Sequence, residues 1–391
     1  MKEKLFLIIV YCLSFSYSKA QEVTFVKNCD ISINDKKILL IGEIHDTYEI
    51  HEIQRYIIND IINKNKQIKH FHLYLESPLS LQYYIENVVS FNDTLALKRY
   101  LQYSGQKKRD TLIAGTEAIY HNILYYTQMA KSMQNSSLKI SCIDNEYGLY
   151  AIIFTILDIL RKYDIQDLVF QEQLHYLDSL FSLHYFFLLD NYASFHKHFG
   201  DYFLSHKEFF QNKLSQRDYY YISEMLNRCP KEMIKIIKTP FWRDAIVTPE
   251  RDIDMYNVIN QHYNDNTFYI AILGRTHVIH SEANIVAKFQ NKFKNVATLL
   301  ETDKNSHFKK HTTSLIFCPL SRSMKTINKN EETRILDIPY QYPTYLAKYT
   351  DYLNSLLTSD NVTFINLKKT KLSNVPRYAD YMIVIKKTMG I

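Results

Sequence analysis

Two segments of the chain place a glycine directly after an apolar run and a histidine three residues after the glycine. In "KKILLIGEIH" the pair is Gly42 and His45, and in "TFYIAILGRTH" it is Gly274 and His277. An imidazole can take a proton near neutral pH or bind a metal through a ring nitrogen. The repeated spacing therefore marks both histidines as candidates for chemistry.

Carboxylates occupy comparable positions. Glu43 lies beside His45, Glu76 ends the apolar run "HFHLYLES", and Asp144 ends "LKISCID". Open parallel sheets bind ligands at the carboxyl ends of their strands, so these side chains are expected on one rim. The set suits two chemistries. His45 and His277 could hold a divalent metal with a carboxylate completing the site, or a histidine could act as general base on water with carboxylates positioning it.

The segment "PERDIDM" allows two interpretations of Arg251. It could simply begin a helix, with its acidic residues favoured at the positive end of the helix dipole. Alternatively, Arg251 could point into the crevice and bind an anion or an oxyanion. The sequence leaves both interpretations open.

The pattern of apolar residues predicts an α/β fold with a mostly parallel central sheet, flanking helices and a large helical insertion or cap. After a signal peptide at 1–20, residues 21–146 form the first half of the α/β domain. Residues 147–240 are aromatic-rich, show helical periodicity and form the cap. Residues 241–391 form the second half with a C-terminal extension, in which "NVATLLE" (295–301) is expected to be a strand.

The N-terminus resembles a secretory signal. A basic start, "MKEK", precedes the apolar run "LFLIIVYCLSFSY", and "SKA" fits a cleavage site before Gln21. We therefore expect export to the periplasm or the extracellular space, with cleavage near Ala20. No later run is long and apolar enough to span a bilayer, so the mature chain is expected to have no membrane span.

Composition excludes some classes and leaves others open. The chain of 391 residues has 47 basic and 41 acidic residues, a net charge of +6. The basic residues are scattered along the sequence, which gives no support for nucleic-acid binding. Four cysteines follow the signal, namely Cys29, Cys142, Cys229 and Cys318, and the sequence leaves their pairing open. Cys142 and Cys318 lie in apolar runs, which favours buried thiols.

These motifs resemble the superfamily that unites TraB/PrgY and Tiki proteins, ChaN-type proteins and erythromycin esterases. The resemblance rests on "GEIH" (42–45), Glu76, "RD" (251–252) and "GRTH" (274–277), and runs from about Lys36 to Leu300. The opening "GEIHDTYEIHEIQ", with His51 and Gln54, is closest to the ChaN type. "ERDIDM" followed by "ILGRTH" is more similar to the TraB and erythromycin esterase branches.

Each branch implies a different function. Tiki-type members imply a metal-dependent protease with the metal at His45, Glu76 and His277. Erythromycin esterases imply metal-free hydrolysis, with His45 as general base, Glu43 and Glu76 orienting it, and Arg251 or His277 stabilising charge. ChaN-type proteins imply haem binding and iron uptake.

We therefore predict an exported hydrolase of ester or amide bonds acting on a small molecule or a peptide. The expected site is Glu43, His45, Glu76, Arg251 and His277. The expected cofactor is a divalent metal (Mn, Co or Zn), with haem as the alternative. The alternative function is a haem- or iron-binding protein without hydrolytic activity.

Overall fold

The structure is a computed structural model. It describes residues 29–44, 48–103, 114–145, 148–182, 189–229, 249–279, 294–327, 333–339, 346–374 and 379–389. The expected signal peptide and His45 lie outside these residues. The chain divides into two compact units. The first contains Met1–His72, Asn135–Ser137 and Asn264–Ile391, and the second contains Leu73–Gln134 and Leu138–Tyr263.

A seven-stranded sheet has the order β3-β2-β4-β1-β5-β9-β8. β1 pairs in parallel with β4 and with β5, β5 pairs in parallel with β9, and β8 runs antiparallel to β9. This confirms the predicted α/β fold with a mostly parallel sheet. The strands are β1 (Ile38–Glu43), β2 (His70–Pro78), β3 (Ser137–Asp144), β4 (Thr267–Gly274), β5 (Thr312–Pro319), β8 (Val362–Asn366) and β9 (Tyr381–Ile385).

β1 lies between two neighbouring strands, which explains its uninterrupted apolar sequence. The side chains of Ile38–Ile41 are fully buried. A parallel strand covered on both faces must be apolar at successive positions, because neither face meets water. Each buried aliphatic side chain contributes about 1.5–3 kcal/mol of transfer free energy.

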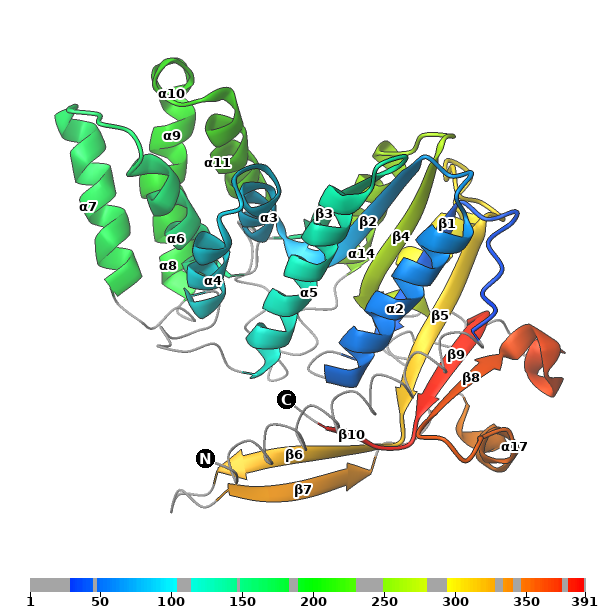
Figure 1. The fold of residues 1–391 in the computed structure, drawn as a ribbon. Coiled ribbons are helices and arrows are strands. Elements are labelled where there is room, and N and C mark those ends of the chain that lie inside the picture. The colour runs from blue at the N-terminus through cyan, green and yellow to red at the C-terminus, as the bar shows by residue number, and fades with distance from the viewer. Residues whose placement is uncertain are drawn as a thin grey trace, which may run out of the picture. The chain divides into compact units, whose positions relative to one another are not determined.

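Helix α2 (Tyr48–Lys64) follows β1 and lies along the strands of the first unit (Figure 1). Its buried face consists of isoleucines at helical spacing, namely Ile50, Ile53, Ile57, Ile58, Ile61 and Ile62. This spacing places them on one side of the helix, so the helix is held to the unit by apolar burial.

The remaining elements of the first unit include a small sheet of order β10-β6-β7, whose hairpin continues directly from β5 (Figure 1). These elements are β6 (Ser321–Ile327), β7 (Thr333–Pro339), β10 (Thr388–Met389), α15 (Arg275–Val278), α16 (Val296–Thr302), α17 (Thr350–Ser355), η4 (Ala347–Tyr349), η5 (Leu367–Lys369) and η6 (Lys371–Asn374).

The strand predicted at 295–301 is wrong, because this segment forms helix α16. The Asn295 side chain accepts a hydrogen bond from the Thr298 backbone N–H at 3.0 Å and so caps the helix. An asparagine at this position satisfies a backbone donor that a helix start otherwise leaves unpaired. This local capping outweighs the strand-like run of apolar residues.

The second unit contains the end of β2, β3 and a set of helices. Within 148–182 and 189–229 the described elements are helices, as the periodicity predicts. They are α3 (Leu79–Phe91), α4 (Thr94–Tyr103), α5 (Ala114–Ser132), α6 (Leu149–Leu160), α7 (Leu168–Ser182), α8 (Leu189–Phe195), the π-helix η1 (His196–Gly200), α9 (Asp201–Ser205), α10 (Lys207–Lys213), α11 (Gln216–Arg228) and α14 (Pro249–Gln261).

Aromatic packing explains the Phe-rich sequence of this unit. Phe195, Phe199 and Phe203 are four residues apart and have ring centroids 5.9 and 6.0 Å from one another in succession. Phe210 packs against Phe203 with centroids 4.4 Å apart. All four rings are fully buried, so packing accounts for these aromatic residues. No helix among the described residues is long and apolar enough to cross a membrane.

Gly42 is required by close packing. A Cβ atom on Gly42 would lie 3.1 Å from Val278 Cβ, 3.2 Å from the Arg275 Cα and 3.2 Å from Ile316 Cγ2. No described glycine has a positive φ, so packing and not backbone freedom explains the glycine at position 42. The absence of a side chain lets α15, which carries His277, approach β1.

We expect Gly42→Ala to lower the free energy of unfolding by about 1–3 kcal/mol, because the added methyl group meets backbone and strand atoms that cannot move freely. Urea denaturation of the mature chain measures this. Gly148→Ala is the control, since its Cβ would make ordinary contact with Ala151 at 3.6 Å. Equal stability of the two variants would contradict the packing role of Gly42.

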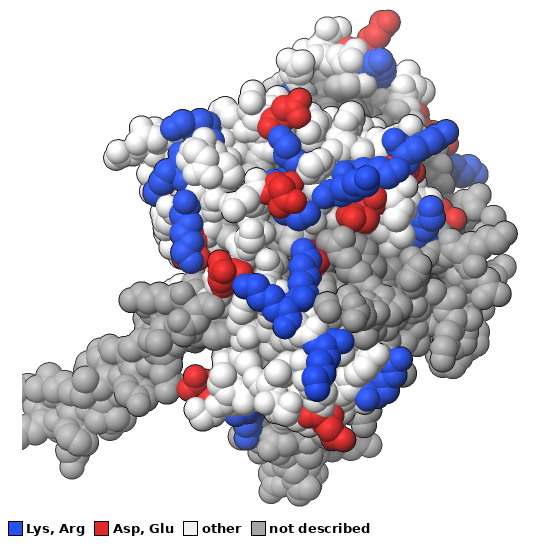
Figure 2. All heavy atoms as spheres, turned by 90° about the vertical axis from the view of Figure 1, so that its right-hand side faces the viewer, with Lys and Arg blue, Asp and Glu red and all other residues white. Residues whose placement is uncertain are grey.

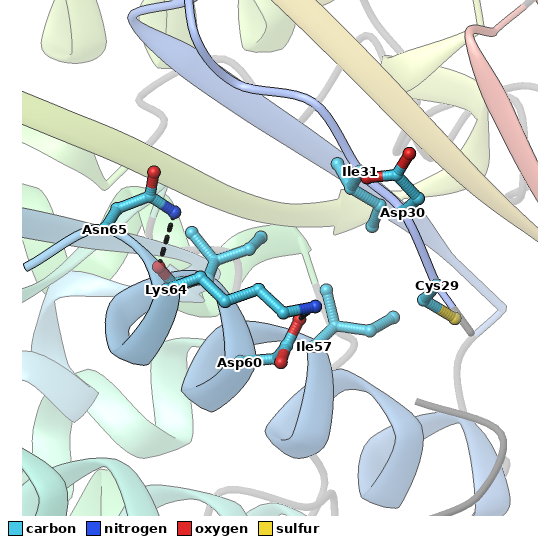
Figure 3. A pocket seen from close by; sticks show the side chains of 8 residues that line it. Cys29, Asp30, Ile31, Ile57, Asp60, Lys64 and Asn65 are labelled. Carbon is cyan, nitrogen blue, oxygen red and sulfur yellow. Dashed lines mark hydrogen bonds and ion pairs between the residues drawn. The ribbon is translucent and has the colours of Figure 1, made fainter. Parts of the chain in front are cut away.

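The four cysteines in the described residues, Cys29, Cys142, Cys229 and Cys318, form no disulfide and are buried. The predicted buried thiols are thus observed at Cys142 and Cys318. Figure 3 shows Cys29 in a water-sized pocket of about 30 Å³ with Ile57, Asp60 and Lys64 of α2. Burial, reinforced by the nearby Asp60 carboxylate, raises the pKa of the Cys29 thiol to about 12. Burial also raises the pKa of Cys318 to about 11.

These thiols are expected to be unreactive in the folded protein, because thiolate is scarce and the sulfurs are covered. Ellman's reagent at pH 8 should modify fewer than about one thiol per native mature chain and all four after unfolding in guanidinium without reductant. Fast modification of the native protein, or fewer than four thiols after unfolding, would contradict burial without disulfides.

Candidate functional site

A buried polar chain starts at Glu43, the last residue of β1. Gln54 Nε2 donates to Glu43 Oε2 at 2.6 Å, and Gln54 Oε1 lies 3.4 Å from His51 Nδ1. His51 and Gln54 are three residues apart on α2 and therefore share a face. Gln54 is fully buried and His51 is buried. Helix α2 thus places two polar side chains against the carboxyl end of β1.

The orientation of the Gln54 amide assigns the proton on His51. Because Nε2 of Gln54 donates to Glu43, its carbonyl oxygen faces His51 and needs a donor. His51 Nδ1 therefore carries the proton and Nε2 carries the lone pair. His51 Nδ1 also lies 3.9 Å from Glu43 Oε2.

The two glycine–histidine segments lie on neighbouring strands. β1 and β4 are paired in parallel, with Glu43 aligned to Gly274. His277 follows on α15 and is 2% exposed. Asn295 Nδ2 donates to the Thr276 carbonyl at 2.8 Å and also to that of Ile279, which fixes the segment. Since His45 lies outside the described residues, its approach to His277 stays a prediction.

In the second unit, Arg251 joins two strand ends. Its Nη2 donates to Glu76 Oε1 at 2.5 Å and to Asp144 Oδ2 at 2.6 Å, and its Nε donates to Asp144 Oδ1 at 2.8 Å. All three side chains are under 10% exposed. The bidentate pair with Asp144 is the geometry in which a guanidinium binds a carboxylate best. Two carboxylates and one guanidinium leave a net charge of −1.

Hydrogen bonds from Asn145 support the cluster of Arg251, Glu76 and Asp144. The Asn145 backbone N–H donates to Asp144 Oδ1 at 2.8 Å, and the Asn145 side chain donates to Asp254 Oδ2 at 2.8 Å. The helix-start interpretation of the segment around Arg251 is observed, whereas the oxyanion role of Arg251 stays a prediction. α14 begins at Pro249 with acidic residues in its first turn, and Arg251 binds carboxylates, which are those of the chain itself.

The surroundings of Glu76 do not fit a metal ligand. The Arg251 guanidinium already donates to its carboxylate, so a divalent cation bound there would be repelled by the neighbouring positive charge. Within the described part of the chain, no three His, Cys, Asp or Glu side chains form a group that could hold a metal. His45, the remaining member of the expected metal set, lies outside it.

The predicted residues therefore fall into separate clusters. Glu43 meets Gln54 and His51 in the first unit, where His277 also lies, and Glu76 meets Arg251 and Asp144 in the second. Asp144 is expected on the rim of strand ends, and His51 and Gln54 are noted in the ChaN-like opening, but none of the three is in the predicted catalytic set. The i,i+3 spacing of His51 and Gln54 directly after the glycine–histidine segment could have identified the first two.

Known proteins resemble this chain in structure. No family model and no curated protein sequence matches it. A variant of the erythromycin esterase EreC in its open conformation matches with a TM-score of 0.56 and 10% identity, over 91% of this chain and 92% of that one. The chain has the fold of an erythromycin esterase.

Two further solved structures match over similar lengths. A succinoglycan biosynthesis protein has a TM-score of 0.51 and 10% identity, over 92% of this chain and 89% of its own. Haem-bound ChaN of Campylobacter jejuni covers 94% and 91% at 12% identity, but its TM-score of 0.32 supports no argument. The fold expected from the resemblance is thus confirmed, whereas the TraB and Tiki branch stays a prediction.

Arg251→Ala is expected to lower the free energy of unfolding by about 3–5 kcal/mol, because it leaves Glu76 and Asp144 buried as two like charges. Chemical denaturation measures the loss. Arg161→Ala is the control, since Arg161 and Asp178 form an ion pair that is 57% and 41% exposed and worth about 1 kcal/mol or less. Adding Asp144→Asn to Arg251→Ala should recover part of the loss, and no recovery would contradict the charge argument.

Proposed function

We propose that the protein is a hydrolase that opens carboxylic ester bonds without a metal ion. The proposal rests above all on Glu43, a carboxylate oriented by the buried Gln54 at the end of β1 and two residues before His45. The fold shared with erythromycin esterase supports the choice of ester over amide bonds.

His45 acts as the general base. It takes a proton from a water molecule, whose oxygen forms a bond to the ester carbonyl carbon. The tetrahedral intermediate then breaks its bond to the leaving alkoxide, which receives the proton from His45. Glu43 stabilises the protonated imidazole, and Gln54 keeps the carboxylate in one orientation. His277 stabilises the charge that develops on the carbonyl oxygen.

In the second unit, Arg251 positions two carboxylates. Its bonds to Glu76 and Asp144 use Nε–H and both Nη2 hydrogens. These contacts favour a fixed, ionised Glu76 over the oxyanion role expected for Arg251. These contacts fix the carboxyl ends of β2 and β3 within the second unit.

The test is hydrolysis of p-nitrophenyl esters and of erythromycin by the purified mature chain, with peptides as the comparison. We expect ester turnover that survives dialysis against EDTA. His45→Ala should reduce kcat by about 100- to 10,000-fold, because it removes the general base. Glu43→Gln should reduce kcat with little change in KM, because the orienting charge is lost.

His175→Ala is the matched control, since His175 is exposed on α7, and it should keep full activity. Turnover that EDTA abolishes and a divalent metal restores would overturn the metal-free mechanism. Unchanged activity of His45→Ala would overturn the assignment of His45 as the general base. Cleavage of peptides but not of esters would show that the protein is a protease and not an esterase.

A further inference from the structure

Lysines gather at the amino ends of the parallel strands in the first unit. β1, β5 and β9 run in the same direction, so their amino ends share one edge of the sheet. The residues just before these three strands are rich in lysine, although they come from distant parts of the sequence. They are Lys36 and Lys37 before β1, Lys309 and Lys310 before β5, and Lys368, Lys369 and Lys371 in η5 and η6 before β9.

Direct contacts show that these segments lie together. Lys36 Nζ donates to the Lys310 carbonyl at 3.2 Å and lies 3.3 Å from Asp35 Oδ2. His311 Nδ1 lies 2.8 Å from the Asp35 carbonyl oxygen. The pKa of the Asp35 carboxyl is lowered by a backbone hydrogen bond first, then by Lys36 and also by Lys368. Three strand starts thus meet around Asp35.

The surface charge of this part of the chain is strongly unequal. Among the described residues in 294–321 and 346–389, nine lysines are exposed but only two acidic residues, Asp351 and Asp360. Asp380 is fully buried, where it pairs with Lys368 at 3.0 Å. Figure 2 shows Lys and Arg side chains spread over one face of the protein, with Asp and Glu side chains between them.

A hollow opens at the same edge. It has a volume of about 760 Å³, and its lining includes Lys36, Lys37, Lys69, His70 and His311. Asp35 and Asp265 also line it and pair with Lys36 at 3.3 Å and with Lys37 at 3.8 Å, so Lys69 and the two histidines supply its remaining cationic character. This volume falls in the range of small-molecule sites, and the lining offers ammonium and imidazole donors. The hollow has room for a phosphate-bearing head group next to the lysine surface.

We propose that this amino edge docks the protein on a bilayer that contains anionic phospholipid. The edge is defined by the seven lysines above and the hollow beside them. Lysine clusters bind anionic bilayers by diffuse attraction, with roughly fivefold stronger binding for each lysine near the surface. Docking by this edge leaves Glu43, at the carboxyl end of β1, directed away from the bilayer.

The residue types favour lipid over nucleic acid. The described cations of 294–321 and 346–389 are all lysines, and no arginine is among them. Lysine is a hydrated point charge, whereas specific nucleic-acid contacts favour the planar arginine fork. Lys348 and Lys371 lie 5.0 and 5.7 Å from the ring centres of Tyr349 and Tyr352, and such amphipathic pairs suit a membrane interface.

The test is co-sedimentation of the mature chain with vesicles of phosphatidylcholine alone or of phosphatidylcholine with about 30% phosphatidylglycerol, which supplies the anionic lipid. We expect at least tenfold tighter binding to the anionic vesicles and weaker binding as salt rises. The triple variant Lys309→Glu, Lys310→Glu, Lys369→Glu should bind at least 100-fold more weakly, since each substitution reverses a charge at the edge.

The control carries the same charge change on the second unit, as Lys98→Glu, Lys207→Glu, Lys213→Glu, all three lysines being exposed. It should bind within about fivefold of wild type, because none of these three lysines belongs to the amino edge. Circular dichroism melting confirms that both variants fold. Equal losses in both variants, no preference for anionic vesicles, or tighter binding to duplex DNA than to vesicles would each overturn the proposal.

Discussion

The parallel direction of β1, β4, β5 and β9 is the constraint on which the rest of the first unit depends. Parallel strands bring every carboxyl end to one edge of a sheet and every amino end to the other. One edge therefore receives Glu43 and the segment that carries His277, and the other receives the lysines. Neither group is contiguous in the sequence, and each is assembled by the direction of the strands.

Close packing at Gly42 allows the helix that carries His277 to lie against β1. The short helix α15 can follow β4 closely only because β1 has no side chain at that point. Asn295 then fixes the same helix by two hydrogen bonds to its backbone carbonyls while capping α16. His277 is thus held from both sides by interactions that involve no reacting group.

The two polar clusters each fix a carboxylate, one by a neutral hydrogen bond and the other by ion pairs. Gln54 is neutral, and it orients Glu43 by one short hydrogen bond without removing its charge. Arg251 instead neutralises part of the charge of Glu76 and Asp144 while fixing both. A buried carboxylate that keeps its charge suits the orientation of a base, whereas an ion-paired carboxylate suits rigid positioning.

The sequence by itself determined the fold class and the buried face of α2, because both follow from the local periodicity of apolar residues. It also determined the strand ends at which polar residues lie, because a glycine or a polar residue ends each apolar run. It also determined that Cys142 and Cys318 would be buried. Local signals were insufficient at 295–301, where a capping side chain outweighs an apolar run. Only the tertiary structure decided that Arg251 binds Glu76 and Asp144, since these residues are 175 and 107 positions away. It also decided that lysines scattered along the sequence form one basic edge, because strand pairing brings together residues that have no local pattern in common.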